Sequence, residues 1–359
     1  MSKHYMNVPV CTLPWFNFVI GWNKFGVCCN SYSQDFGSIA DFSHHASIKK
    51  ELFNYENYVH MREALLNGDL PEPCIRCSNK YSAGSFGQLQ NRIGDIMLPI
   101  EDPQQLRRAF VNYNNAVSSV LRGDSVVDYM PVYAVVTCGS ACNIRCKFCY
   151  NCNMNYHPEP DDILKIIDKI HETLVYCQLT GGEPMITKAG RALLGKFAEG
   201  KYKFAVRLGT NAQFVDFDLL KPVNLADVQI STDAATRQVY ETVRIGGDFD
   251  DLIRNIKKFV ELKKEKPHLK ISTNYTVTSD NYMDIPEACK LYEDLGTFTM
   301  FGLVMREKDD PQNIQERPDL YEPLLKKLDE AMTVAVNPIT KDKLMAIKNT
   351  ILKKMDKMR

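Results

Sequence analysis

Short runs of β-branched and apolar residues alternate with amphipathic stretches from Pro131 onward. This alternation is typical of repeated βα units around a parallel sheet. We expect six such units. The predicted strands span residues 132–137, 174–180, 204–210, 227–232, 270–278 and 298–304. The predicted helices span residues 161–173, 188–199, 214–220, 234–243, 249–264 and 283–295.

Six units are too few to close an eight-stranded barrel. The predicted fold is therefore α/β, a partial (β/α)6 TIM-like barrel with a small N-terminal cysteine-rich domain. Ligands are expected at the carboxyl ends of the strands, where the βα loops meet. The predicted domains are a cysteine-rich module (1–86), a helical linker (87–130), the partial barrel (131–310) and a C-terminal helical extension (311–359).

Charge and hydropathy narrow the class of protein. Lys+Arg and Asp+Glu are equal at 44 each, so no net field favours nucleic acid or an anionic membrane. The N-terminus has no export signal, and the longest apolar stretches, such as 16–22, are shorter than the roughly 20 residues of a membrane span. We therefore predict a cytoplasmic protein without a nucleic-acid or membrane partner. Its 12 cysteines should be thiols or metal thiolates.

The cysteines fall into groups that predict two metal sites. Cys177 and Cys289 stand alone, and both are expected to be buried. The other ten form two groups, Cys11, Cys28, Cys29, Cys74 and Cys77, then Cys138, Cys142, Cys146, Cys149 and Cys152.

The second group contains a CxxxCxxC loop directly after the first predicted barrel strand. Cys142, Cys146 and Cys149 can hold three irons of a [4Fe–4S] cube, which leaves the fourth iron open to a ligand. A zinc knuckle is the structural alternative, but zinc prefers four closed ligands in CxxC pairs, often with His, and the loop has no His. Cys138 and Cys152 flank the loop too closely to be obvious ligands.

This loop resembles the hallmark of the radical S-adenosylmethionine (radical SAM) superfamily, CxxxCxΦC, with Phe148 at the aromatic position. The resemblance implies that the amino and carboxylate groups of S-adenosylmethionine chelate the open iron. It also implies reductive cleavage to a 5′-deoxyadenosyl radical that abstracts a substrate hydrogen.

A second motif, Gly181-Gly182-Glu183-Pro184, follows the second predicted strand. Glycines let backbone carbonyls approach a small ligand, and a glutamate can balance an ammonium. The motif resembles the GGEP sequence of the same superfamily, which binds the methionine amino group. An ordinary strand-to-helix turn is the alternative interpretation of this tetrapeptide taken alone.

Weaker matches complete the predicted cofactor site. Asn211 and Ser231 follow the third and fourth strands and resemble the polar strand ends of the superfamily, with Ser231 as the ribose contact. Arg244 resembles the arginine that pairs with the methionine carboxylate, for which a guanidinium fork is well shaped.

The N-terminal cysteines resemble a SPASM/twitch auxiliary-cluster module, including a Met61–Leu65 helix and a Gly68–Pro71 turn before the final CxxC. The resemblance implies a second [4Fe–4S] cluster held by Cys11, Cys28 or Cys29, Cys74 and Cys77. A closed structural zinc site is the alternative, because four cysteines including a CxxC also suit zinc.

The predicted function is reductive cleavage of S-adenosylmethionine followed by hydrogen abstraction from a peptide or small-molecule substrate. Dehydrogenation, crosslinking and epimerisation remain open as outcomes. An external electron donor of the flavodoxin or ferredoxin type is implied. The alternative from another class is a non-catalytic iron–sulfur electron carrier or a cluster-stabilised binding module, for which GGEP and Arg244 would have no use.

Overall fold

The computed structural model describes residues 11–28, 31, 36–39, 52–74 and 100–358. The chain divides into two compact units, and the division passes through strands β6 and β7. Unit 1 contains residues 1–140, 155–208 and 217–226. Unit 2 contains residues 141–154, 209–216 and 227–359.

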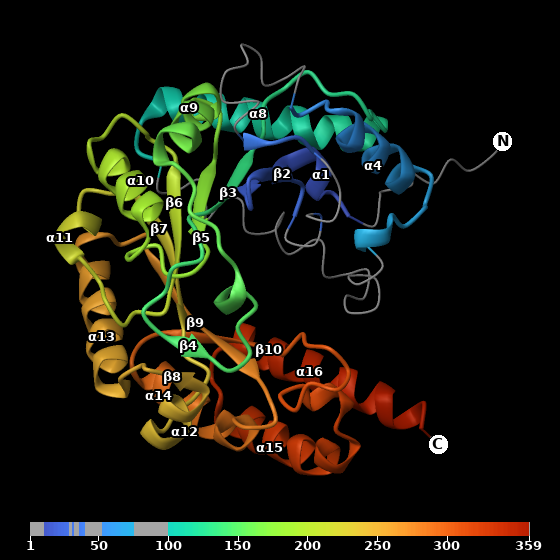
Figure 1. Ribbon diagram of the computed structural model, residues 1–359, viewed down its shortest axis with the longest axis vertical. Helices are drawn as coiled ribbons and strands as arrows, with labels where there is room; N and C mark the ends of the chain where they lie inside the picture. Colours follow the sequence, from blue (N-terminus) through green and yellow to red (C-terminus); the bar gives the residue numbers. More distant parts are fainter. Residues whose placement is uncertain (1–10, 29–30, 32–35, 40–51, 75–99, 359) are drawn as a thin grey trace. The chain divides into compact units, whose positions relative to one another are not determined.

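Unit 1 is built on a mostly parallel sheet with the strand order β6-β5-β3-β1-β2 (Figure 1). Among the described strands of this sheet, only β2 is antiparallel to its neighbour. The strands are β1 (Asn17–Gly21), β2 (Lys24–Gly26), β3 (Tyr133–Thr137), β5 (Tyr176–Thr180) and β6 (Ala205–Thr210). The sequence analysis predicted β3, β5 and β6, and the structure confirms them. It did not predict β1 and β2, which extend the same sheet.

The helices of unit 1 bury apolar faces as their sequence pattern predicts. In α9 the four isoleucines 163, 166, 167 and 170 are buried, and Figure 1 shows α9 and α10 beside strands β5 and β6. The helices are α1 (Leu13–Phe16), α4 (Glu56–Leu66), α8 (Pro103–Arg122), α9 (Pro160–Ile170), α10 (Lys188–Ala198) and α11 (Phe217–Leu220).

Capping residues set both boundaries of helix α8. Asp102 caps its first turn by accepting a hydrogen bond from Gln105 N at 2.7 Å, and Pro103 occupies the position where a missing N–H costs nothing. Gly123 ends the helix with φ +76°, a left-handed conformation that glycine adopts without strain.

Unit 2 continues the parallel pattern with the strand order β7-β9-β10, and α14 and α16 pack against β10. A separate two-residue ladder joins β4 to β8. The strands are β4 (Arg145–Cys146), β7 (Leu225–Ser231), β8 (Arg244–Ile245), β9 (Lys270–Val277) and β10 (Phe298–Leu303). The helices are α12 (Arg237–Val243), α13 (Phe249–Glu265), α14 (Ile285–Asp294), α15 (Tyr321–Val334) and α16 (Pro338–Asp356).

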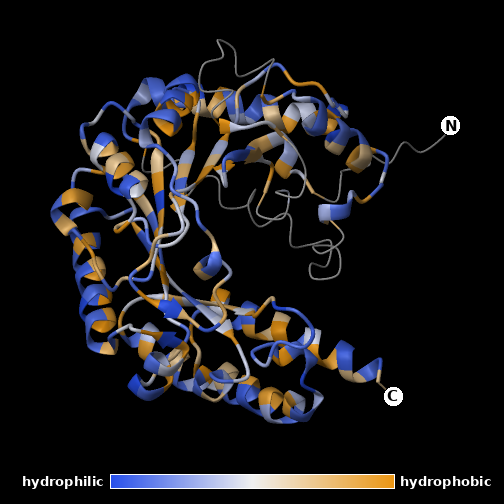
Figure 2. Ribbon diagram, in the orientation of Figure 1, coloured by the Kyte–Doolittle hydropathy of each residue, from blue (hydrophilic) through white to orange (hydrophobic). Residues whose placement is uncertain are grey.

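The parallel α/β fold predicted from the sequence is confirmed. All six predicted barrel strands are present: β3, β5 and β6 begin in unit 1, and β7, β9 and β10 are the strands of unit 2 that match the other three predictions. Hydrophobic residues follow the strands, whereas the helices carry hydrophilic residues on one face (Figure 2). Strands covered on both sides are expected to be nearly continuous in apolar residues, as β3 is. Within the described residues, no helix has the length and apolar character needed to cross a membrane.

Arg62 is a buried charge of unit 1 with several hydrogen-bond acceptors around it. Its side chain is fully buried, and it donates hydrogen bonds to the carbonyl oxygens of Pro14 (2.9 Å), Phe53 (2.8 Å) and Ser125 (3.0 Å). Its guanidinium also lies 4.8 Å from the centroid of the Phe53 ring. Burial lowers the pKa of Arg62 to about 10, which leaves it charged at neutral pH. One arginine therefore joins the segments before β1, before α4 and after α8.

We predict that Arg62→Met lowers the free energy of unfolding by about 3 kcal/mol or more, because buried carbonyl groups would lose their donor. Chemical denaturation measures this loss. The matched control is Arg122→Met, since Arg122 is exposed and pairs with Asp124 at 2.6 Å on the surface. That change should cost at most about 1 kcal/mol. Equal losses in the two variants would contradict the prediction.

Candidate functional site

The CxxxCxxC loop lies in unit 2 and is held by a short ladder. Cys146 belongs to β4 and pairs with Arg244 of β8, and Lys147 N donates to Val243 O at 3.0 Å. Cys142 is exposed, whereas Cys146 and Cys149 are half-buried. The backbone of the loop is therefore fixed at its central cysteine.

Two N–H groups of unit 2 donate to sulfur atoms of this loop. Asn211 Nδ2 lies 3.4 Å from Cys142 Sγ, and Asn151 N lies 3.3 Å from Cys149 Sγ. Such donors stabilise a thiolate and tune the potential of a bound iron–sulfur cluster. Burial raises the pKa of Cys146 to about 11, although the positive charge of Arg244 opposes this. Metal binding at Cys146 would therefore release a proton.

Three thiols in eight residues, with N–H donors on two of them, fit the donor set of a [4Fe–4S] cluster. The fit is one of donor chemistry. Among the described residues, no three His, Cys, Asp or Glu side chains are gathered as a ready metal site. The predicted iron ligands Cys142, Cys146 and Cys149 thus share one loop without already converging on a single point.

Arg244 is buried and forms an ion pair with Asp233. Its Nε and Nη2 lie 2.8 and 2.5 Å from Asp233 Oδ2, and both side chains are no more than 5% exposed. Burial by itself lowers the pKa of Arg244, but the charges of Asp233 and Cys146 raise it above its ordinary value. The guanidinium fork that the sequence analysis assigned to the methionine carboxylate is thus largely engaged by Asp233.

The GGEP motif lies in unit 1 and forms a tight turn between β5 and α10. Gly181 has φ +133°, and a Cβ there would stand 2.6 Å from Gly139 O, so no side chain fits. Gly182 N donates to that same carbonyl at 2.7 Å. Glu183 is fully buried, and its Oε1 accepts a hydrogen bond from Met185 N at 3.2 Å. The turn therefore places a carboxylate in the protein interior, where its electrostatic interactions are strong.

Three of the other predicted cofactor residues lie in unit 2, and the fourth lies in unit 1. Asn211 is buried, and besides Cys142 it donates to Asn143 Oδ1 at 2.9 Å, so it braces the cysteine loop. Ser231 ends β7 opposite Asn274 of β9 and is half-buried. Phe148 is half-buried within the loop. Pro184 belongs to the GGEP turn of unit 1.

The N-terminal cysteines lie in unit 1 where they are described. Cys11, Cys28 and Cys74 are half-buried thiols. Cys28 is fixed by Ser31, whose Oγ donates to Cys28 O at 2.9 Å and accepts from Cys28 N at 3.1 Å. Cys29 and Cys77 lie outside the described residues. The proposed auxiliary ligands therefore remain a prediction.

The isolated Cys177 and Cys289 are buried as expected, and so is Cys138 beside the cysteine loop. Cys138, Cys177 and Cys289 are buried, and burial raises the pKa of Cys138 and Cys289 to about 12. They are therefore protonated at neutral pH. Cys152 is exposed, and its Sγ donates to Cys149 O at 3.2 Å.

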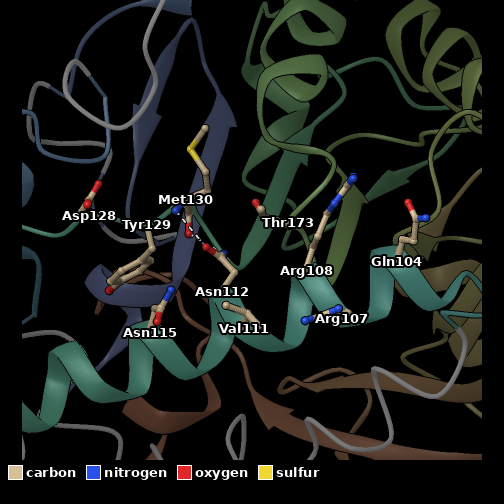
Figure 3. A pocket seen from close by; sticks show the side chains of 10 residues that line it. All are labelled: Gln104, Arg107, Arg108, Val111, Asn112, Asn115, Asp128, Tyr129, Met130 and Thr173. Carbon is tan, nitrogen blue, oxygen red and sulfur yellow. Dashed lines mark hydrogen bonds between the residues drawn. The ribbon is translucent and has the colours of Figure 1, made fainter.

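A surface pocket of about 570 Å³ lies along α8 in unit 1 (Figure 3). Two of its polar side chains bond to other protein groups. Asn112 Nδ2 donates to Met130 O at 2.8 Å, and Arg108 pairs with Glu172 at 3.1 Å. None of the site residues predicted from the sequence lines this pocket. Asn112 instead holds the segment that leads into β3.

Residues 136–292 match the profile of the radical SAM superfamily. These residues are a radical SAM domain. The superfamily implies a [4Fe–4S] cluster and S-adenosylmethionine, and its members are enzymes. The domain contains both the CxxxCxxC loop and the GGEP turn.

Individual relatives resemble parts of the chain. A probable GTP 3′,8-cyclase of Methanocaldococcus jannaschii is 24% identical over 163 residues, which cover 43% of this chain and 53% of that protein. Streptococcus suis SuiB bound to S-adenosylmethionine aligns with 18% identity and a TM-score of 0.47, covering 70% of this chain and 59% of SuiB. The anSMEcpe structure with bound AdoMet aligns with 22% identity and a TM-score of 0.45, covering 58% and 63%. The chain thus spans about half the length of the curated relative.

Sequence reasoning gave little weight to two residues of the radical SAM domain. It assigned no separate role to Asp233 at the end of the fourth strand, yet this residue forms the ion pair with Arg244. It did not consider Asn151, whose backbone donates to Cys149. A charged residue directly after an apolar strand was the available signal for Asp233. A backbone donor gives no sequence signal.

We predict that Asn211→Ala makes the reduction potential of the cluster at this loop more negative, because the N–H donor to Cys142 stabilises added negative charge on the sulfur atoms. A redox titration followed by electron paramagnetic resonance measures the shift.

The control is Asn255→Ala, since Asn255 Nδ2 supports the same turn by donating to Ala212 O at 2.7 Å and makes no described bond to sulfur. An equal shift in both variants would show that turn geometry, and not the N–H···S bond, sets the potential.

Proposed function

We propose that this protein reductively cleaves S-adenosylmethionine and abstracts hydrogen from a peptide or small-molecule substrate. The observation that carries the proposal is the CxxxCxxC loop with its sulfur-directed donors, set within a radical SAM domain. When bound, the [4Fe–4S] cluster would supply the electron that breaks the sulfonium bond. Cys142, Cys146 and Cys149 would hold it.

Glu183 would bind the methionine ammonium. Its carboxylate is fully buried and is oriented by Met185 N, so it is fixed before a ligand arrives. A preorganised buried carboxylate binds a cation more strongly than an exposed one, because little water and little side-chain entropy are lost on binding. Gly181 and Gly182 would let the ligand approach the backbone.

Arg244 would contact the methionine carboxylate through Nη1, since Nε and Nη2 bond to Asp233. Ser231 would bind the ribose, and Asn211 and Phe148 would complete the cofactor site. These assignments follow the resemblance residue by residue. Arg244 therefore carries a single directed contact in the proposal, not the bidentate fork that the sequence suggested.

We further propose an auxiliary [4Fe–4S] cluster on Cys11, Cys28 or Cys29, Cys74 and Cys77. Support comes from the resemblance to the SPASM/twitch module and from the half-buried thiols of Cys11, Cys28 and Cys74. The auxiliary cluster would accept an electron from a substrate radical or orient the substrate. An external donor of the flavodoxin or ferredoxin type would reduce the protein.

The iron content tests both clusters together. We predict about eight irons per chain after anaerobic reconstitution, from two [4Fe–4S] cubes. The triple variant Cys142→Ala, Cys146→Ala, Cys149→Ala should retain about four irons and form no 5′-deoxyadenosine. Metal analysis and chromatography of the products measure these outcomes.

Each half of the proposal has its own contrary result. About four irons plus one zinc in the unmodified protein would reject the auxiliary cluster and leave the radical SAM site intact. Production of 5′-deoxyadenosine by the triple variant would reject the catalytic assignment. Binding of S-adenosylmethionine also separates this proposal from a plain electron carrier, which requires no such pocket.

We predict that Glu183→Gln weakens S-adenosylmethionine binding by roughly one to two orders of magnitude, because a charge-assisted hydrogen bond contributes about 1.5–3 kcal/mol. The amide oxygen of Gln can still accept from Met185 N, so the turn should persist. Anaerobic calorimetry measures the affinity. Glu199→Gln is the control, since Glu199 is an exposed partner of Lys196. Unchanged affinity in Glu183→Gln would return the GGEP motif to a purely structural turn.

A further inference from the structure

We propose that Asp233 is a positioning residue that holds Cys146 in place through Arg244. This inference rests on the proposed role of the cysteine loop, because only a metal-binding loop needs its central cysteine to be held. Its contacts all lie within unit 2. They connect the end of β7 to β8, and β8 to β4, the strand that contains Cys146.

The first link is the buried ion pair. Two nitrogens of Arg244, Nε and Nη2, contact the single oxygen Oδ2 of Asp233, and the two side chains are 5% and 2% exposed. Removing one partner of such a pair strands the other charge in the protein interior, which is strongly destabilising. The pair therefore holds its two backbone segments together far more firmly than a surface ion pair would.

The second link is the β4–β8 ladder. Arg244 is the residue of β8 that pairs with Cys146, and Ile245 pairs with Arg145. A two-residue ladder has few hydrogen bonds of its own, so its position depends on what anchors it. The Arg244 side chain supplies that anchor because it extends from the same residue that faces Cys146.

The third link fixes Asp233 itself. Its φ is +56°, a left-handed conformation that aspartate adopts more readily than most residues. Its Oδ1 accepts a hydrogen bond from Thr276 N at 2.5 Å, and its backbone oxygen accepts one from Asn281 Nδ2 at 2.8 Å. Asn281 is fully buried. Asp233 is thus attached to β9 and to the loop after it, and it passes that rigidity to Arg244.

The test measures the ladder directly, in the full-length protein without a cluster. Hydrogen exchange followed by mass spectrometry reports the protection of amides 145–147, which include Lys147 N bonded to Val243 O. In Asp233→Asn the amide group cannot accept from both Arg244 and Thr276. We expect these amides to exchange at least about tenfold faster than in the unmodified protein, while β9 and β10 stay protected.

A second readout uses the reconstituted protein. Loss of a residue that orients a metal ligand typically weakens metal retention about 10- to 100-fold. We expect a chelator to remove iron from the cysteine loop faster in Asp233→Asn, with an altered electron paramagnetic resonance signal. Asp233→Glu, which keeps the charge, should restore part of both properties.

The control removes a buried polar contact elsewhere in unit 2. Thr273 and Thr299 share a buried hydrogen bond of 2.8 Å between β9 and β10, so Thr273→Val should leave amides 145–147 protected. Unchanged protection of these amides in Asp233→Asn would overturn the proposal. If Asp233→Asn unfolds β9 and β10 as well, Arg244→Gln, which removes the same ion pair from the other side, decides by the same measurement: protection equal to that of the unmodified protein overturns the proposal, and selective loss at 145–147 supports it.

The exchange measurement needs neither cluster nor S-adenosylmethionine. A protein that lacked radical SAM activity would therefore still show whether Asp233 holds the ladder. Conversely, the unmodified protein could prove active while amides 145–147 keep their protection in Asp233→Asn. That result would refute the positioning role and leave the proposed function standing. The two failures are distinguishable.

Discussion

Sharp reversals of the backbone at the carboxyl ends of parallel strands are the constraint on which the site depends. Residues with positive φ follow within two positions of four strand ends, namely Gly139 after β3, Gly181 after β5, Ala212 after β6 and Asp233 after β7. A non-glycine residue in this conformation costs about 1–2 kcal/mol, so its neighbours must stabilise it. Thr210 Oγ1 accepts from Ala212 N at 3.0 Å, and Asn281 holds Asp233. The two non-glycine residues are thus held by neighbouring polar groups.

The charged groups near these reversals are unlike those on the rest of the surface. Glu183, Asp233 and Arg244 are buried, whereas most other ion pairs of the described chain, such as Lys188 with Glu159, are exposed. Burial of ionised groups is costly unless they are paired or bind a charged ligand. The ion pair between Asp233 and Arg244 offsets the cost of burying these two charges. In the proposed function, the buried carboxylate of Glu183 would recognise the ammonium of a methionine zwitterion. An electron carrier would have no ligand for such a carboxylate to bind.

The cysteine-rich N-terminal segment is joined to the sheet by physical contacts that its sequence did not reveal. β1 pairs in parallel with β3, and Arg62 bonds to three separate stretches of backbone in unit 1. Phe53 and Tyr58 pack around this arginine. The thiols of Cys11, Cys28 and Cys74 are thus carried by a segment continuous with the parallel sheet. A cluster bound there would be supported by the sheet of unit 1.

The sequence by itself determined the six barrel strands, most of the helices and the two motifs, because these depend on local periodicity and on residue spacing. The run at 132–137 is apolar, and the run at 270–278 is rich in β-branched residues, so both favour strands. β1 was not predictable in the same way, since its strand character depends on pairing with β3, more than 100 residues away. The ion pair between Asp233 and Arg244 likewise depends on the tertiary structure. Eleven positions separate them along the chain, and only folding around β9 brings the carboxylate to the guanidinium and away from water.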